Sequence, residues 1–109
     1  PAKAADLIFT ARRLGPQEAL EMGAVDRFAG AESGQSALEL AFDMARGIAG
    51  HSPVGLHNAK RALRRGADVD LATGLDVEDG CWRATAFSGD RREGVAAFAE
   101  KRRPNWPGV

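Results

Sequence analysis

The 109-residue sequence predicts a mainly α-helical fold, with about six helices and at most one short strand. Three observations lead to this prediction. Apolar residues recur three and four positions apart over most of the chain, glycine or proline interrupts each run, and only one brief stretch alternates apolar and polar residues. A chain of this length fits one domain that is large enough to bury a core.

The N-terminal part predicts two short helices and then an extended segment. The first helix is expected to end near "ARRLG", residues 11–15, because apolar residues lie at helical spacing up to that stretch: Ala4, Leu7, Ile8 and Ala11. Pro16 suits the first position of the second helix, and Gly23 suits a left-handed C-terminal end. The stretch "AVDRFA", residues 24–29, is the best candidate for a strand or for an extended crossing segment.

Two further helices are predicted in the middle of the chain. The third, which ends at Gly50, has one apolar face made of Leu38, Ala41, Met44, Ala45 and Ile48. The fourth is expected to begin with Ser52 as its cap and Pro53 in its first turn, and to end at Gly66.

The fifth predicted helix begins after Asp70, a suitable cap, and ends near Gly89. Its apolar residues Leu71, Leu75 and Trp82 are expected to pack into the core or against another subunit. Gly74 and Gly80 would each cost roughly 1 kcal/mol relative to alanine, so they predict close contacts with another backbone.

The last helix is expected to start near Asp90 and to stop before Pro104, with Val95, Phe98 and Ala99 turned inward. Solvated faces are expected for its charged residues.

Composition argues against several classes of protein. Fifteen basic residues balance fifteen acidic ones, so no overall field favours nucleic acid or a membrane surface. No apolar run approaches the roughly 20 residues of a membrane span. The single cysteine, Cys81, cannot form an internal disulfide and fits a reducing compartment, which makes the cytoplasm the expected location.

The residues alone predict no catalytic or metal site. His51 and His57 are six residues apart, which differs from the usual ligand spacing on a helix. The stretch "ADVDLATG" begins like a calcium loop, but Ala72 and Gly74 supply no side-chain oxygen. No spacing pairs the carboxylates as a general acid and base, these being Glu78, Asp79, Glu93 and Glu100. No glycine-rich phosphate loop is present.

Two basic clusters remain, "KRALRR" and "EKRRPNW". A basic cluster beside an aromatic residue such as Trp106 can bind single-stranded RNA, by pairing with phosphates and stacking on bases. Cations also complement the negative end of a helix dipole, and this second interpretation fits the balanced charge better. Nucleic acid is therefore not the expected partner.

Three long blocks resemble a known family: "ADLIFTARRLGPQEALEMGAVDRF", "SPVGLHNAKRALRRG" and "DLATGLDVEDGCWRATAFSGDRREGVAAFAEKRRPNW". Together they resemble the C-terminal part of an enoyl-CoA hydratase of the crotonase family. The resemblance leaves only the loop at residues 29–35 unmatched. It implies that residues 1–28 end a spiral core of ββα turns and that residues 36–109 form the helical segment that packs subunits into trimers, often two per hexamer.

The resemblance also implies an activity. Hydratases of this family add water to 2-enoyl-CoA thioesters with two glutamates, while two backbone amides polarise the thioester carbonyl. All four groups belong to the region before the matched one. We therefore expect no catalytic residue, no metal and no cofactor other than the CoA thioester substrate, and we expect the chain alone to be inactive.

The same resemblance assigns Phe98 and Lys101 to CoA binding. In the family, an aromatic residue and a lysine three positions later, at the C-terminal helix, meet the adenine and a phosphate of CoA, often in a neighbouring subunit. Two alternatives stay open, a non-catalytic helical interaction module and an RNA-binding member of the family. The acyl group, and hydration as opposed to isomerisation or other crotonase chemistry, are not specified by these residues.

Overall fold

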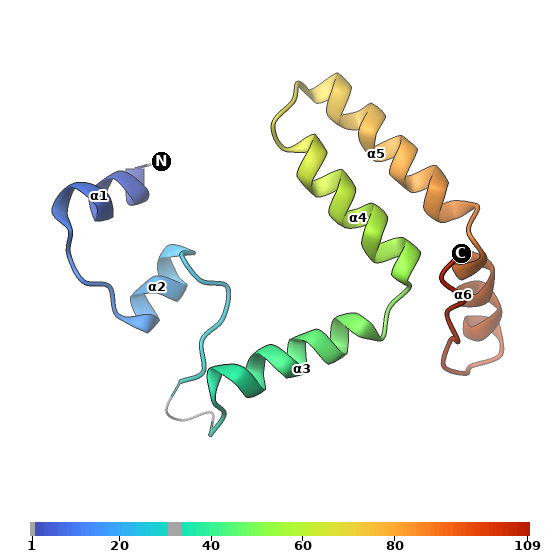
Figure 1. Ribbon diagram of the computed structural model, residues 1–109, viewed down its shortest axis with the longest axis horizontal. Helices are drawn as coiled ribbons and strands as arrows, with labels where there is room; N and C mark the ends of the chain where they lie inside the picture. Colours follow the sequence, from blue (N-terminus) through green and yellow to red (C-terminus); the bar gives the residue numbers. More distant parts are fainter. Residues whose placement is uncertain (1, 31–33) are drawn as a thin grey trace. The chain divides into compact units, whose positions relative to one another are not determined.

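The computed structural model describes residues 2–30 and 34–109, and it contains the six expected helices (Figure 1). They are α1 (Ala2–Thr10), α2 (Pro16–Met22), α3 (Ala37–Ala49), α4 (Pro53–Gly66), α5 (Leu71–Ala86) and α6 (Gly89–Ala99). The mainly α-helical prediction is confirmed. The chain divides into two compact units, Pro1–Ala45 and Arg46–Val109, and each is described by itself.

No strand occurs among the described residues, which agrees with at most one short strand, and of the two interpretations of residues 24–29 the strand is wrong. Gly23 ends α2 in the left-handed conformation, with φ of 75°, as expected. The backbone amides of Ala24 and Val25 then donate to the carbonyl of Ala19 at 2.8 and 3.3 Å. The segment begins by folding back onto the end of α2, and a strand would also need a partner strand to satisfy its backbone groups.

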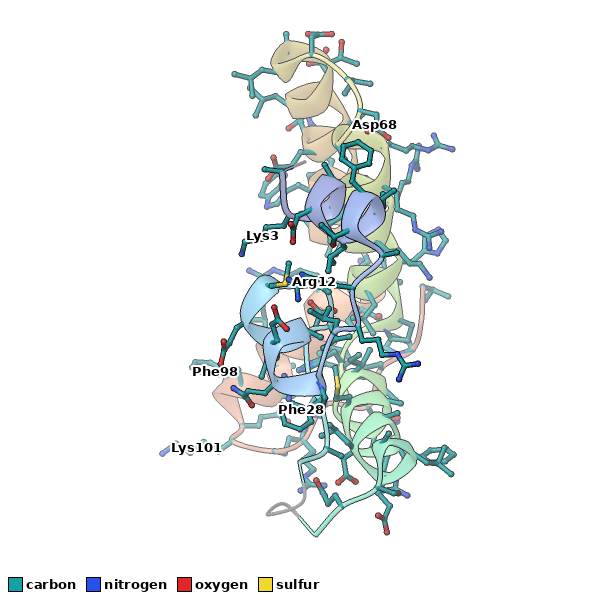
Figure 2. The ribbon with its side chains drawn as sticks, turned by 90° about the vertical axis from the view of Figure 1, so that its left-hand side faces the viewer. Lys3, Arg12, Phe28, Asp68, Phe98 and Lys101 are labelled. Atoms are coloured by element: carbon teal, nitrogen blue, oxygen red, sulfur yellow. The ribbon has the colours of Figure 1, made fainter. Side chains whose placement is uncertain are left out.

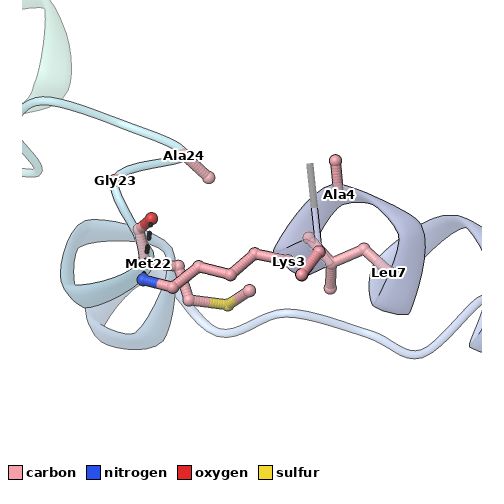
Figure 3. A pocket seen from close by; sticks show the side chains of 7 residues that line it. Lys3, Ala4, Leu7, Met22, Gly23 and Ala24 are labelled. Atoms are coloured by element: carbon pink, nitrogen blue, oxygen red, sulfur yellow. Dashed lines mark hydrogen bonds between the residues drawn. The ribbon is translucent and has the colours of Figure 1, made fainter.

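Polar contacts connect α1 and α2 in the first unit. The Lys3 amine donates to the carbonyl of Met22 at 3.4 Å, across a shallow hollow of about 510 Å³ (Figure 3). Arg12 forms ion pairs with Asp6 at 3.2 Å and Glu18 at 2.8 Å. Because these groups are largely exposed, each pair adds little stability. Ile8 and Phe9 of α1 are exposed, so this unit buries little apolar surface.

The second unit is built on an antiparallel hairpin of α4 and α5, with α6 following a short turn (Figure 1). Local caps explain where these helices begin. Ser52 accepts a hydrogen bond from the amide of Gly55, Asp70 accepts one from Thr73, and Ser88 accepts one from Arg91. The predicted caps Ser52 and Asp70 are confirmed.

The two glycines of α5 differ in their surroundings. A Cβ placed on Gly74 would lie 3.5 Å from the carbonyl oxygen of Gly66, so the expected close approach of α4 is confirmed. A Cβ on Gly80 would have no neighbour within 4 Å among the described residues, so the same expectation is wrong there. Gly80 is therefore not required by the packing of this hairpin.

The expected apolar core is small. Among the described residues, the buried apolar side chains are Ala19, Cys81 and Ala97. Trp82 is 64% exposed and Leu71 is 79% exposed, so within the described residues neither is packed into a core. The helices keep their apolar faces without a partner because too few elements are present to cover them. No described helix has the length and apolar character to cross a membrane.

We expect Gly80→Ala to stabilise the chain by about 1 kcal/mol, because alanine favours the helix and the added methyl has free space. Gly89→Ala is the matched control, since its Cβ would lie 2.9 Å from the carbonyl oxygen of Val109 and should destabilise by about 1–3 kcal/mol. Urea unfolding followed by circular dichroism measures both. A destabilising Gly80→Ala would contradict the hairpin packing described above.

Candidate functional site

The C-terminal turn after α6 carries the two residues that the sequence assigned to CoA binding. Helix α6 ends at Ala99, and Glu100 is its cap residue. The amide of Lys101 donates to the carbonyl of Phe98 at 3.2 Å, and the amide of Arg102 donates to that of Ala97 at 3.0 Å. This pair of hydrogen bonds closes the helix in the way a left-handed C-terminal residue allows.

Lys101 occupies the left-handed position of this turn, with φ of 55°. Glycine is the usual residue there, because a side chain with a Cβ is disfavoured at positive φ. The resemblance places this lysine at the C-terminal helix, and in the structure Lys101 lies just beyond the end of that helix, after the cap residue Glu100. Its backbone is held at the start of a chain reversal.

Phe98 and Lys101 both project into solvent, on the same side of the ribbon (Figure 2). Phe98 is 88% exposed, so the expectation that it turns inward is wrong. The Lys101 side chain has no hydrogen bond or ion pair with any other described residue, and it is exposed. An exposed ring can stack on a planar base, and an unpaired ammonium can pair with a phosphate oxygen.

Glu93 fixes the segment that follows Lys101. Its two carboxylate oxygens accept hydrogen bonds from Nη1 and Nη2 of Arg102, at 2.5 and 3.0 Å. The backbone amide of Asn105 donates to the same carboxylate at 2.6 Å. The Arg102 guanidinium, and next the Asn105 amide, lower the pKa of Glu93 to about 2. Glu93 is therefore ionised at neutral pH and is not a candidate proton donor.

Trp106 holds the C-terminal tail, which is the segment 102–109 after α6, against the start of the second unit. Its ring nitrogen donates to the carbonyl of Gly50 at 2.9 Å. A Cβ on Gly94 would come within 3.2 Å of the ring, so the ring lies against the surface of α6. This contact fixes the tail in a second place, after Asn105.

Asp90 fixes the tail in a third place and is only 1% exposed. It accepts hydrogen bonds from the Ser52 hydroxyl at 2.6 Å, the Val54 amide at 3.2 Å and the Gly108 amide at 2.6 Å. Burial would raise its pKa, but these three donors outweigh burial and leave the pKa below its ordinary value. Asp90 is thus a structural carboxylate.

The other residues considered in the sequence do not assemble into a site. Among the described residues, no three of the histidine, cysteine, aspartate and glutamate side chains gather as a metal site would require. Cys81 is buried, as expected of a core residue. The sequence reasoning missed the contacts of Asp90, Glu93 and Arg102. The bonds of Asp90 to Ser52, Val54 and Gly108 span 18 to 38 residues, and the pair of Glu93 with Arg102 spans 9, so none forms a local motif.

A second surface feature is an apolar groove between α4 and α5, with a volume of about 820 Å³. Leu63, Val69, Leu71 and Leu75 line it together with small residues of both helices. Leu63 is 76% exposed, which is unusual for a residue on the apolar face of a hairpin. The groove offers apolar surface to another element or subunit.

The pKa of Glu93 predicts how stability depends on pH. A carboxylate whose folded pKa is about 2, against 4.5 ordinarily, stabilises the fold above about pH 4.5 and loses this effect as the pH falls through 2. Glu93→Gln should therefore melt at a lower temperature than the unchanged chain at pH 7, and the difference should narrow towards pH 2. Thermal melting between pH 2 and 7 measures this.

Glu100→Gln is the matched control, because Glu100 pairs with the same Arg102 but its side chain is 60% exposed, against 18% for Glu93. Its effect on the melting temperature should be smaller. A difference between Glu93→Gln and the unchanged chain that stays constant from pH 7 to pH 2 would contradict the low pKa.

Comparison with known proteins identifies the family. Residues 1–108 match the family model described as enoyl-CoA hydratase/isomerase. Rat (Rattus norvegicus) mitochondrial methylglutaconyl-CoA hydratase is 41% identical over 108 residues, covering 98% of this chain and 34% of the relative. The mitochondrial enoyl-CoA hydratase domain-containing protein 2 of Mus musculus is 40% identical over 108 residues, covering 98% and 36%.

Solved structures agree with this result. The crystal structure of an enoyl-CoA hydratase from Bacillus anthracis matches with a TM-score of 0.91 and 37% identity, over 100% of this chain and 41% of that one. The chain spans about a third of the length of the curated relatives it matches. Because the family model covers nearly every residue, the chain belongs to the enoyl-CoA hydratase/isomerase family.

Proposed function

We propose that this chain is the C-terminal part of an enoyl-CoA hydratase, and that it supplies part of the CoA-binding surface through Phe98 and Lys101. The observation that carries the proposal is the exposed Phe98 ring and, three residues later, an exposed and unpaired Lys101 side chain whose backbone is fixed in a turn. A ring and a cation of this kind suit the adenine and a phosphate of CoA.

The reaction we propose for the complete protein is addition of water to the double bond of a 2-enoyl-CoA thioester, in fatty-acid or branched-chain acyl-CoA degradation. The names of the relatives, methylglutaconyl-CoA hydratase and an enoyl-CoA hydratase domain-containing protein, support hydration. The acid and base glutamates and the oxyanion donors would come from the part of the protein before this chain. No metal or further cofactor is required.

The division of the chain follows from the same proposal. Residues 1–28 would end the spiral core, and residues 36–109 would form the helical segment that packs subunits into a trimer or a hexamer. The exposed apolar groove between α4 and α5 supports a packing role, because such surface is stable in water only when it is covered. The same observation favours the alternative of a helical interaction module. We also propose a cytoplasmic location.

RNA binding is less well supported than CoA binding. The basic residues of α4, Lys60, Arg61, Arg64 and Arg65, are exposed, and the helix carries no acidic residue. In the second basic cluster, however, the Trp106 ring lies against Gly94 and its nitrogen donates to Gly50, so this ring is not free to stack on a base. Arg102 is likewise paired with Glu93.

We expect Phe98→Ala and Lys101→Ala, made in the complete protein, each to raise the KM for 2-butenoyl-CoA about 3- to 10-fold and to leave kcat nearly unchanged. The lost stacking and the lost contact with a phosphate are each worth about 1 kcal/mol, or somewhat more, of binding. Steady-state kinetics measure both constants. Since both side chains are exposed, folding should be unaffected.

Two comparisons test whether the rise in KM comes from lost contacts with the adenine and phosphates of CoA. The KM for 2-butenoyl-pantetheine, which lacks the adenine and its phosphates, should not change in either variant. Arg103→Ala, which removes an exposed cation two residues from Lys101, should leave both KM values within about twofold of the unchanged protein. Equal changes of KM for the two substrates would refute the proposed role. The isolated 109-residue chain should not hydrate 2-butenoyl-CoA.

The groove between α4 and α5 gives a separate test of subunit packing. Leu63→Asp places a charge in the groove and should reduce the oligomer of the complete protein to smaller species, measured by light scattering after size-exclusion chromatography. Arg61→Gln changes the net charge by the same amount on the same helix without lining the groove, and it should leave the oligomer intact. An unchanged oligomer in Leu63→Asp would contradict the packing role.

A further inference from the structure

We propose that Glu93 is the positioning residue that holds Lys101 at the CoA-binding surface, and this inference rests on the proposed function of Lys101. The two residues do not touch the same ligand in this scheme. Glu93 acts through the Arg102 side chain and the Asn105 backbone amide, whereas Lys101 would contact the phosphate.

The backbone of Lys101 has an unfavourable conformation. Lys101 has φ of 55°, and a residue with a Cβ keeps this conformation only when its surroundings determine it. The amides of Lys101 and Arg102 reach back to carbonyls of α6 and account for the start of the reversal. Without further contacts, the following residues could leave the helix and carry the lysine away from Phe98.

Glu93 anchors the residues that follow Lys101. Glu93 lies on α6, and its carboxylate binds the residue directly after Lys101, Arg102, through both terminal nitrogens of the guanidinium. It also accepts the amide of Asn105, so one side chain fixes both ends of the segment 102–105. A two-point pair between arginine and carboxylate sets orientation as well as distance.

The charged side chains around the turn are paired unequally. Arg102 is neutralised by Glu93 and by Glu100, whose carboxylate accepts from Nε of Arg102. The Lys101 amine has no such partner among the described residues. The acidic groups are thus occupied by the neighbouring arginine, which leaves the lysine available for an anion. A carboxylate pairing with Lys101 instead would compete with that anion.

The test is a double-mutant cycle in the complete protein with Glu93→Gln and Lys101→Ala. Glu93→Gln should raise the KM for 2-butenoyl-CoA about threefold or more, with kcat and the KM for 2-butenoyl-pantetheine unchanged. In the Lys101→Ala background the same change should have less than about a 1.5-fold effect, because nothing is left to position. Asp79→Asn, which breaks an exposed pair with Arg83, is the matched control and should change neither KM.

Arg102→Lys serves as a second variant, milder than Glu93→Gln, because it keeps the charge but loses the two-point contact. It should raise the same KM in the same selective way, with the melting temperature confirming a folded protein. Equal effects of Glu93→Gln with and without Lys101 would overturn the positioning role and leave the role of Lys101 intact. If Lys101→Ala itself changes no KM, the proposed function and this inference both fail.

Discussion

The buried carboxylate of Asp90 is the interaction on which the second unit depends. It accepts hydrogen bonds from Ser52 and Val54 at the start of α4 and from Gly108 in the tail, while it lies itself in the first turn of α6. A buried charge without an arginine or lysine partner is stable only when hydrogen-bond donors surround it. Helix N-termini provide such donors and a favourable field, so the charge draws two helix starts and the tail together.

This polar organisation matters because the apolar core is small. Cys81 and Ala97 are the buried apolar residues of the second unit among those described, while large side chains such as Trp82 and Leu71 face solvent. The free energy that normally comes from apolar burial is therefore small within the unit. The exposed faces fit a segment that completes its core with other parts of a larger assembly, as proposed above for this family member.

Local features of the sequence were sufficient to predict the helices, and contacts between distant residues were not. Ser52 and Asp70 cap helices through amides three residues away, so each boundary is visible in a short stretch. The carboxylate of Asp90, in contrast, joins Ser52 across 38 residues, and no motif announces such a pair. Phe98 was expected inward because periodicity identifies an apolar face but not whether anything covers it. The strand interpretation of residues 24–29 was wrong for the same reason, because a short alternating pattern does not show whether a partner strand is present.

Contacts of the C-terminal tail fix the backbone around the candidate site. Asn105, Trp106 and Gly108 are each bound to the rest of the unit, through Glu93, Gly50 and Asp90 respectively. A ligand that meets Phe98 and Lys101 therefore finds the backbone of both residues already placed, and only side-chain torsions remain to be ordered. Because ordering a flexible segment reduces affinity, a turn fixed in advance makes an exposed lysine a more effective phosphate ligand than the same lysine on a free tail. The left-handed conformation of Lys101 thus costs some local backbone stability and fixes the point from which the side chain extends.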